Sequence, residues 1–356
     1  MLLGINTVAI RLRAVEEGKI LRQDKILLAH GGGGELTARL IDEHIVKKLQ
    51  NDKLSPLMDS AVLEPMSGPV CMTTDSFVVQ PLDFPGGDIG RLAVCGTVND
   101  LIMMGAEPRG LSLAFIIEEG LEITKLDQIV DSIAQTAKEA SVSIVTGDTK
   151  VVERGRGDGL LINTAGIGEQ RKELKLGYDE IVEGDLILIN GPIAEHGLAV
   201  MSAREGLSFA TELKSDVAPL GSLVSALLDS GACVKFMRDP TRSGIAGVAN
   251  DLAQGTSLSI DLDESAIPLT GVVRHTAEML GLDPLTVANE GKAVVVVAAK
   301  DKDKALKALK SHPLGKEAAV IGEFTKAKPP LVELVTRIGG RRVVQRPYGE
   351  ELPRIC

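Results

Sequence analysis

Two hydrophobic periods alternate along this chain from about residue 68 onwards. Over residues 126–137 the apolar side chains recur three or four positions apart, which is the spacing of one helix face. The pattern Thr124-x-x-Asp127 is typical of a capping box, so we expect that helix to start there. Asp88 is placed to cap another helix that begins at Ile89. Shorter β-rich runs predict strands over residues 70–80, 111–117, 142–145 and 160–167.

A second set of elements follows a charged stretch, residues 169–185, which has no apolar period and which we interpret as an interdomain link. Helices and strands mixed in this way indicate the α/β (or α+β) class, in two domains. The predicted strands of the second set lie over 186–190, 234–238 and 293–299, and its helices over 196–205, 220–230, from Ser243, and over 301–310.

The expected organisation is an N-terminal extension over 1–24, a first domain over 25–170, a second over 184–338 and a tail over 339–356. The tail carries Gly, Pro and charged residues, so we expect it to be flexible. An extended chain spans roughly 3.3 Å per residue, which lets a tail of this length cross a domain and enter a cleft.

The composition excludes several classes of function. The net charge is −10, there is no Lys/Arg block, and only 2% of residues are aromatic, so nucleic acid is not an expected partner. No apolar run can span a bilayer, and the N-terminus is not a signal or transit peptide. Four cysteines without a CxxC pair favour a reducing cytoplasm. Three of them lie in apolar stretches and are interpreted as core residues, namely Cys71, Cys95 and Cys233.

Four consecutive glycines precede a predicted helix that begins near Glu35, and they follow a short apolar run interpreted as a strand. Such a loop either approaches a phosphate group with its backbone N–H groups or is a flexible turn. It is neither a Walker A loop nor a GxGxxG motif. The four residues are Gly31, Gly32, Gly33 and Gly34.

Three aspartates, Asp75, Asp100 and Asp148, lie in or at the ends of apolar elements of the first domain. A carboxylate there is costly to bury unless a cation or hydrogen-bond donors compensate it. Each one alone is compatible with a cap or turn; together they favour a Mg²⁺–phosphate site. Lys150, two residues after Asp148, would then place a positive charge on phosphate.

Two polar turns in the second domain are less specific. The first, Asp239-Pro240-Thr241-Arg242-Ser243-Gly244, is interpreted as structural, with Ser243 as a helix cap. In the second, Glu290 precedes a very apolar strand and is compatible with a general base or with a surface turn. The lone histidines His196 and His275 are interpreted as structural.

Taken in order, these motifs resemble the aminoimidazole ribonucleotide synthetase (PurM) superfamily. The terminal Pro353-Arg354-Ile355-Cys356 resembles, within it, the HypE-type family of [NiFe]-hydrogenase maturation proteins. The likeness covers nearly everything from residue 25 to the end. Its motifs are the glycine loop, Thr74-Asp75-Ser76, Phe84-Pro85-Gly86-Gly87, Asn99-Asp100, Gly147-Asp148-Thr149-Lys150, Asp239-Pro240-Thr241-Arg242 and Asn289-Glu290-Gly291-Lys292.

The resemblance implies a PurM-like fold whose first-domain sheet pairs across a homodimer, and a reaction on the Cys356 thiol. A HypF-type partner carbamoylates Cys356, and ATP with Mg²⁺ drives dehydration of the carbamoyl group to S-cyanide. A HypC–HypD complex then receives the cyanide as an iron ligand. The implied Mg²⁺ ligands are Asp75, Asp100 and Asp148, the ATP-binding residues are the four glycines, Asn99 and Thr149, and the catalytic residues are Cys356, Glu290 and Lys150.

The residues themselves are consistent with this chemistry, because a thiolate is a good nucleophile and carrier. Chance placement of so rare a residue at the last position has odds of roughly one or two in a hundred. One alternative is another activity of the superfamily, such as selenophosphate synthesis, although the first cysteine, Cys71, follows the glycine loop rather than preceding it. Another is a thiol carrier without catalysis.

Overall fold

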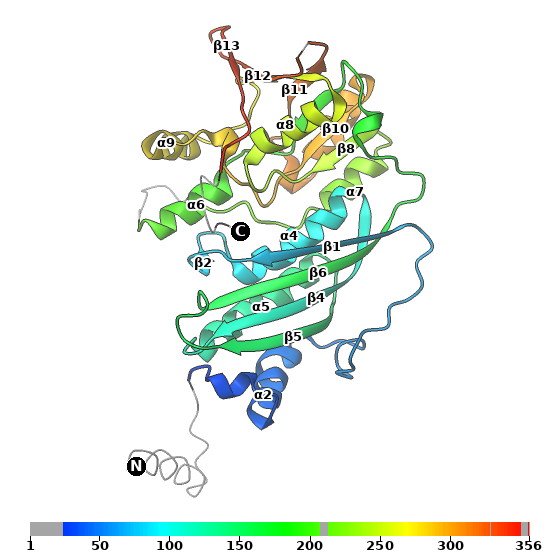
Figure 1. Ribbon diagram of the computed structural model, residues 1–356. Coiled ribbons are helices and arrows are strands. Elements are labelled where there is room, and N and C mark those ends of the chain that lie inside the picture. The colour runs from blue at the N-terminus through cyan, green and yellow to red at the C-terminus, as the bar shows by residue number, and fades with distance from the viewer. Residues whose placement is uncertain (1–23, 207–212, 328, 350–354, 356) are drawn as a thin grey trace, which may run out of the picture.

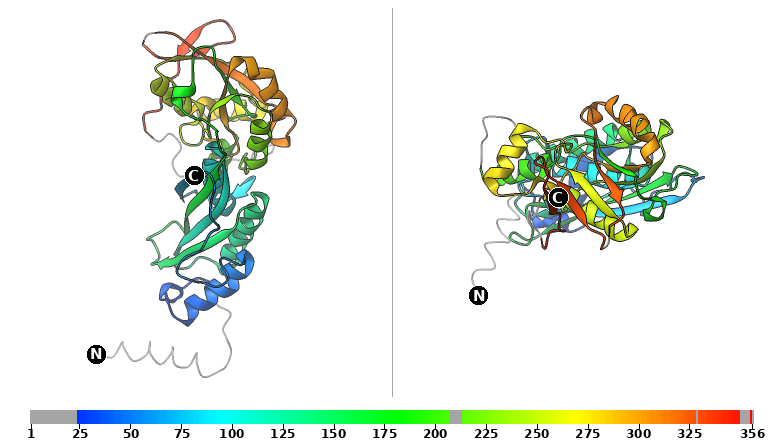
Figure 2. Two further views of the ribbon diagram at one scale, coloured as in Figure 1. Left: turned by 90° about the vertical axis from the view of Figure 1, so that its right-hand side faces the viewer. Right: turned by 90° about the horizontal axis from the view of Figure 1, so that it is seen from above.

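The protein consists of two α/β domains that lie end to end (Figure 1; Figure 2). The computed structural model describes residues 24–206, 213–327, 329–349 and 355, so nearly all of the predicted extension falls outside the described residues. The predicted pair of mixed α/β domains is confirmed. Within the described ranges, no helix has the length and apolar character needed to cross a bilayer.

The first domain is built on a four-stranded sheet of order β1-β6-β4-β5. Its elements are α2 (Glu35–Leu40), α3 (Lys47–Leu49), β1 (Val70–Phe77), β2 (Asp83–Phe84), β3 (Gly87–Asp88), α4 (Ile89–Met103), β4 (Ala106–Glu118), α5 (Ile123–Glu139), β5 (Ile144–Val152) and β6 (Leu160–Gln170). β6 runs antiparallel to β1 and β4, and β5 runs parallel to β4. Helices α4 and α5 cover one face of the sheet, and α2 lies beside its β5 edge (Figure 1).

Helix α4 is mostly apolar, is buried on nearly all sides, and contacts both domains. Asp88 caps it as predicted, since its Oδ1 accepts a hydrogen bond from the Arg91 N–H at 2.9 Å. One side of α4 packs on the sheet, and the other contacts α7 and β8 of the second domain. A helix without a polar face is stable only when it is buried all round. Because of this position, α4 carries Asn99 and Asp100 to the boundary between the domains.

Helix α5 has the apolar face that its periodicity predicts, but its predicted start was wrong. The helix begins at Ile123, so Thr124 lies inside its first turn. The Ile123 N–H is satisfied by the Asp24 carbonyl at 2.9 Å. Asp127 is therefore not needed as a capping partner, and its carboxylate pairs with Lys48 at 3.0 Å. The buried face consists of Leu126, Ile129, Val130, Ile133, Thr136 and Ala137.

The second domain is built on a seven-stranded sheet of order β13-β12-β9-β11-β7-β10-β8. Its elements are β7 (Leu186–Ile189), α6 (Glu195–Arg204), α7 (Gly221–Asp229), β8 (Val234–Arg238), α8 (Gly244–Thr256), β9 (Ser259–Asp263), α9 (Gly271–Leu280), β10 (Val294–Val297), α10 (Lys302–Lys310), β11 (Ala319–Thr325), β12 (Val332–Val335) and β13 (Arg341–Val343). All strand pairs are antiparallel except β9 with β12. Helices and loops cover both faces of β10, and all four of its valines are buried.

Part of the predicted tail packs on this domain. Strand β13 is the sheet's edge, and Val344 and Ile355 are 2% and 5% exposed. Residues 350–354 and Cys356 lie outside the described residues. The flexibility of the tail therefore stays a prediction, whereas Val344 and Ile355 are buried.

Three local predictions were wrong. The run before the glycine loop forms a 3-10 turn, Leu28–Gly31, rather than a strand. Ser243 makes no side-chain cap, because its left-handed backbone (φ 63°) does not aim the hydroxyl at the first N–H groups of α8. Among Cys71, Cys95 and Cys233, only Cys95 is a core residue, since Cys71 is half-buried and Cys233 is exposed.

Candidate active site

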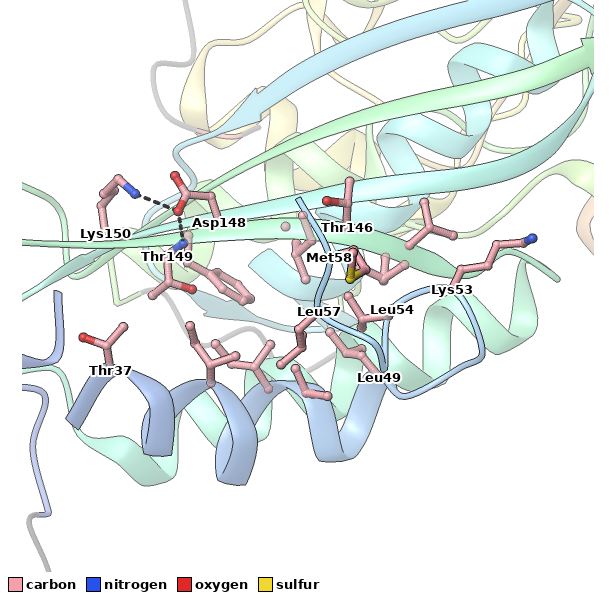
Figure 3. Close-up of a pocket in the computed structure, with 18 of the residues that line it drawn as sticks. Thr37, Leu49, Lys53, Leu54, Leu57, Met58, Thr146, Asp148, Thr149 and Lys150 are labelled. Carbon is pink, nitrogen blue, oxygen red and sulfur yellow. Dashed lines mark hydrogen bonds and ion pairs between the residues drawn. The ribbon is translucent and has the colours of Figure 1, made fainter. Parts of the chain in front are cut away.

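A cavity of about 360 Å³ lies between the N-terminal helices and strand β5, beside the glycine loop. In Figure 3 the helical side chains face β5 across this cavity. Gly31 and Gly33 line one end of it together with Asp148, Thr149 and Lys150, so the structure brings these predicted ligand residues together. The remaining wall is mostly apolar, and it includes Ile41, Ile45, Leu49, Leu54, Leu57, Met58 and Phe115.

The glycine loop has specific backbone requirements at two positions. A Cβ on Gly31 would lie 2.8 Å from the backbone nitrogen of Val151, so no side chain fits between the loop and β5. Gly33 has a φ of 78°, which favours glycine, and its N–H donates to Thr37 Oγ1 at 2.9 Å. Around the ideal Cβ positions of Gly33 and Gly34 there is open space. The loop is thus held by α2 and leaves room for a ligand.

An ion pair marks the polar end of the cavity. Lys150 Nζ lies 2.7 Å from Asp148 Oδ1, and the Thr149 N–H donates to the same oxygen at 2.8 Å. Lys150 holds the pKa of Asp148 below its ordinary value. Both side chains are more than half exposed, so the pair contributes little to stability. Both charges are accessible to a ligand in the cavity.

A cluster of four acids lies away from this cavity, at the boundary between the two domains. Asp75 comes from β1, Asp100 from α4, Asp239 from the end of β8, and Glu290 from the turn before β10. Burial, followed by the charges of Asp100 and Asp75, raises the pKa of Asp239 to about 7. Burial is also the main cause that raises the pKa of Asp100 and of Glu290. A divalent cation stabilises a group of carboxylates that repel each other in this way.

The three predicted Mg²⁺ ligands are not assembled within one chain. Asp75 and Asp100 share the acid cluster, whereas Asp148 is on β5, at the opposite edge of the sheet from β1. Among the described residues, no three His, Cys, Asp or Glu side chains converge on one ion position. The oxygen-only donor set of the cluster still fits Mg²⁺, which prefers one or two carboxylates together with phosphate oxygens and water.

Glu290 is buried, so its interpretation as a surface turn is wrong. The residue is 3% exposed, and its Oε1 atom is buried without a hydrogen-bond partner. The Glu290 N–H donates to Asp216 Oδ1 at 3.1 Å, and Asp216 also accepts from Lys292 Nζ at 2.9 Å. Burial works against the charge of Asp216, but the Lys292 ammonium and the hydrogen bond from the Glu290 N–H outweigh it and lower the pKa of Asp216. The turn that carries Glu290 is therefore held by hydrogen bonds to Asp216, whereas the Glu290 carboxyl itself has one oxygen without a hydrogen-bond partner.

Asn99 does not lie at the glycine loop, where ATP binding was predicted. It is 1% exposed, and its Nδ2 donates to the carbonyls of Ala218 (3.0 Å) and Glu290 (3.3 Å). Its Oδ1 accepts from the Leu220 N–H at 2.9 Å. All of these partners belong to the second domain, so Asn99 fixes the Glu290 turn against α4. Sequence reasoning missed Asp216, gave Lys292 no role although it belongs to a recognised motif, and took Asp239 for part of a structural turn.

The acid cluster gives Asp239 a measurable effect on stability. Its native pKa, about 7, is above the ordinary value of about 3.9, so the unfolded chain releases this proton first as the pH rises. The folded state therefore loses stability between those two values, and the loss is complete above the higher one. We expect Asp239→Asn to raise the melting temperature in EDTA at about pH 8 and to leave it nearly unchanged at about pH 4. Thermal unfolding of both proteins across this range measures the effect; a difference that does not vary with pH would contradict it.

Comparisons with known proteins agree with this architecture. The model for the AIR synthase related protein N-terminal domain matches residues 58–170, and that for the C-terminal domain matches residues 182–333. The carbamoyl dehydratase HypE of Rhizobium leguminosarum bv. viciae is 48% identical over 333 residues, covering 93% of this chain and 95% of the relative.

Two solved structures are similar over most of their length. A hydrogenase maturation protein HypE in complex with ATP superposes with a TM-score of 0.89 at 42% identity, covering 93% of this chain and 99% of that one. A HypE chain from a HypE–HypF complex gives a TM-score of 0.76 at 46% identity, covering 88% and 100%.

The fold and the paired domains define an AIR synthase related protein. More narrowly, the chain belongs to the HypE family of carbamoyl dehydratases, enzymes of hydrogenase maturation, and the resemblance drawn from its motifs is confirmed.

Proposed function

We propose that this chain converts an S-carbamoyl group on Cys356 to an S-cyano group at the expense of ATP. The observation that carries the proposal is the buried Glu290 carboxyl, whose Oε1 has no hydrogen-bond partner and whose pKa is raised by burial and by four neighbouring aspartates. A buried carboxylate with a raised pKa is a stronger base than an exposed one. The reaction needs such a base, because it removes a proton from the carbamoyl nitrogen.

The cavity beside β5 is the proposed site for ATP, which is a substrate of this reaction. Its apolar wall suits a flat base, and its volume of about 360 Å³ lies within the range of ligand pockets. Gly31, Gly33 and Lys150 at its polar end suit phosphate groups. A relative of known structure contains ATP. When bound by Asp75 and Asp100, Mg²⁺ would neutralise phosphate charge during transfer.

The chemistry balances without an oxidant or reductant. The carbamoyl oxygen attacks the terminal phosphorus of ATP, and ADP leaves. The nitrogen loses the first of its two protons to solvent as the O-phosphorylated intermediate forms. Glu290 then accepts the second proton as the C–O bond breaks, phosphate departs, and a C≡N bond remains on sulfur. Lys150 stabilises the negative charge that develops on the transferred group.

Partners follow from the same chemistry. A HypF-type carbamoyltransferase would load Cys356, and a related HypE chain has been solved in complex with HypF. A HypC–HypD complex carrying iron would accept the cyanide. A carrier thiol also requires reducing conditions, which agrees with the cytoplasmic setting that the cysteine pattern favours.

We also propose a homodimer that forms through the face of the first-domain sheet that the helices leave uncovered. Val70, Met72 and Ile116 on this face are 58%, 76% and 41% exposed, which is unusual for a soluble sheet surface. Pairing would let the β5 edge of one copy meet the β1 edge of the other, uniting the cavity with the acid cluster. Each complete site would then take Lys150 from one copy and Glu290 from the other.

This arrangement predicts complementation between inactive variants. A mixture of Lys150→Ala and Glu290→Gln subunits, allowed to exchange, forms mixed dimers with one intact site, so activity should return. Dehydration rates before and after exchange measure this. No recovery despite proven exchange would place both residues in one copy's site, and sedimentation as a monomer would reject the dimer.

The proposed reaction is tested by the mass of the C-terminal peptide. The protein is first incubated with an active HypF-type transferase and its substrates, then isolated and treated with Mg-ATP. A carbamoyl adduct on Cys356 that loses one water after ATP addition supports the proposal. An adduct that persists indicates a passive carrier, and the absence of any adduct, with the donor shown to be active, rejects the role of Cys356.

A further inference from the structure

His196 holds the peptide group that joins Ile355 to Cys356. It is 0% exposed, at the start of α6, and its Nε2 lies 2.7 Å from the carbonyl oxygen of Ile355. Its Nδ1 lies 2.8 Å from Ser215 Oγ. The aromatic ring of Phe84, from the first domain, packs edge-on against the imidazole at 5.3 Å. A residue interpreted from sequence as structural therefore contacts the tail one residue before its end.

The hydrogen bonds fix the form of the imidazole. A carbonyl oxygen only accepts, so Nε2 must carry the hydrogen in this contact. Burial is the main influence on the ring and lowers the pKa of His196, which favours the neutral form. Nδ1 is then an acceptor, and the Ser215 hydroxyl donates to it. Ser215 Oγ in turn accepts from the Val217 N–H at 3.1 Å. Each donor in this series of hydrogen bonds, from the Val217 N–H to the His196 ring, therefore meets an acceptor.

The tail supplies a second anchor at the same place. The Ile355 side chain is 5% exposed and belongs to the hydrophobic core. Burying an aliphatic side chain this completely stabilises the docked tail. Ile355 is thus held through both its main chain and its side chain, as expected of a specific docking site and not of a chance surface contact.

The same histidine lies near the residues that hold Glu290. The charge of Asp216 acts on His196, and Asp216 accepts hydrogen bonds from the Glu290 and Gly291 N–H groups. A tail fixed by His196 is therefore fixed relative to the turn that carries the proposed base.

From this geometry we infer that His196 and Ser215, with the apolar site for Ile355, form a docking site that positions the C-terminal tail for reaction. His196 is a positioning residue: it acts on the tail through the Ile355 carbonyl. Its importance for catalysis rests on the proposed function, whereas the docking itself does not.

A serine carboxypeptidase tests the docking directly, because it cleaves the bond between Ile355 and Cys356. The Ile355 carbonyl cannot accept from His196 and enter the oxyanion hole of the protease at the same time. When docking is fast relative to cleavage, the release of Cys356 reports the undocked fraction. The assay uses the full-length protein and needs no dehydratase activity.

Two histidine variants separate the two ring contacts. His196→Asn keeps an oxygen near the Nδ1 position for Ser215 but loses the donor to Ile355, and should speed the release of Cys356 by about 2- to 10-fold, the range expected for one hydrogen bond. His196→Gln keeps a donor near the Nε2 position and should restore slow release. Single-turnover dehydration should fall in the Asn variant and recover in the Gln variant.

Ile355→Ala changes a side chain of the tail, leaves His196 and Ser215 in place, and tests the same dock from the tail side. We expect faster release of Cys356 here too, with Cys95, which is fully buried, still unreactive toward a thiol reagent. Unchanged release in both His196→Asn and Ile355→Ala would overturn the inference, as would faster release accompanied by exposure of Cys95. If release responds as expected while the wild-type protein shows no dehydration, the docking site stands and the proposed function fails.

Discussion

Replacing Glu290 by Gln is expected to slow dehydration of the carbamoylated tail by about 10²- to 10⁴-fold, the usual contribution of a general base. Glutamine matches glutamate in size but cannot accept the proton from the carbamoyl nitrogen. The measurement is single-turnover conversion of S-carbamoyl to S-cyano protein, followed by mass spectrometry. Loading of Cys356 by the transferase should continue at the wild-type rate, because it does not use this base.

The fold should survive this substitution. Glu290 has a buried oxygen without a partner and a raised pKa, so its charged form is unfavourable in the native state, and an amide removes that cost. Its backbone contacts with Asn99 and Asp216 do not involve the side chain and are retained. Glu290→Asp is the matched control: it keeps the carboxylate but moves it, and should retain part of the rate. A wild-type rate in Glu290→Gln would remove Glu290 from the mechanism.

Periodicity was a good guide to the fold wherever one face of an element meets the core. The apolar stripe of α5 and the capping of α4 by Asp88 are both observed. Boundaries failed where distant residues satisfy a helix end, as Asp24 does for Ile123. No local pattern encodes such a contact, because it depends on how the chain returns to that place.

In the candidate site, too, local motifs could be predicted, whereas contacts between distant residues could not. Gly31 is far in sequence from Asp148 and Lys150, and only the likeness of their motifs to a known family suggested that the glycine loop meets this pair, as it does in one cavity. The mutual placement of Asp75, Asp100, Asp239 and Glu290 depends on docking of the second domain against α4. Asp216 lies in an unremarkable polar stretch, so its role as an acceptor for the Glu290 turn had no signal in the sequence.

Removal of the Lys150 charge has the second largest expected effect. Lys150→Ala should lower kcat/KM for ATP-dependent dehydration by about 10²-fold, as expected for loss of a group that stabilises developing charge. The cause is twofold. A positive charge disappears from the polar end of the cavity, and Asp148, whose low pKa depends mainly on Lys150, keeps its negative charge there without compensation and repels phosphate. Steady-state kinetics in ATP and single-turnover rates measure the loss.

Lys53 provides a matched control, because it lines the same cavity at the end away from the ion pair (Figure 3). Its ammonium group donates to the Val62 carbonyl at 3.2 Å and lies 3.7 Å from Glu64. Lys53→Ala therefore removes an equal charge from the apolar end and should change the rate only slightly. Lys150→Arg should recover part of the activity. Equal losses in Lys53→Ala and Lys150→Ala would mean that the cavity needs positive charge only in general, and would refute a specific role of Lys150 at the transferred group.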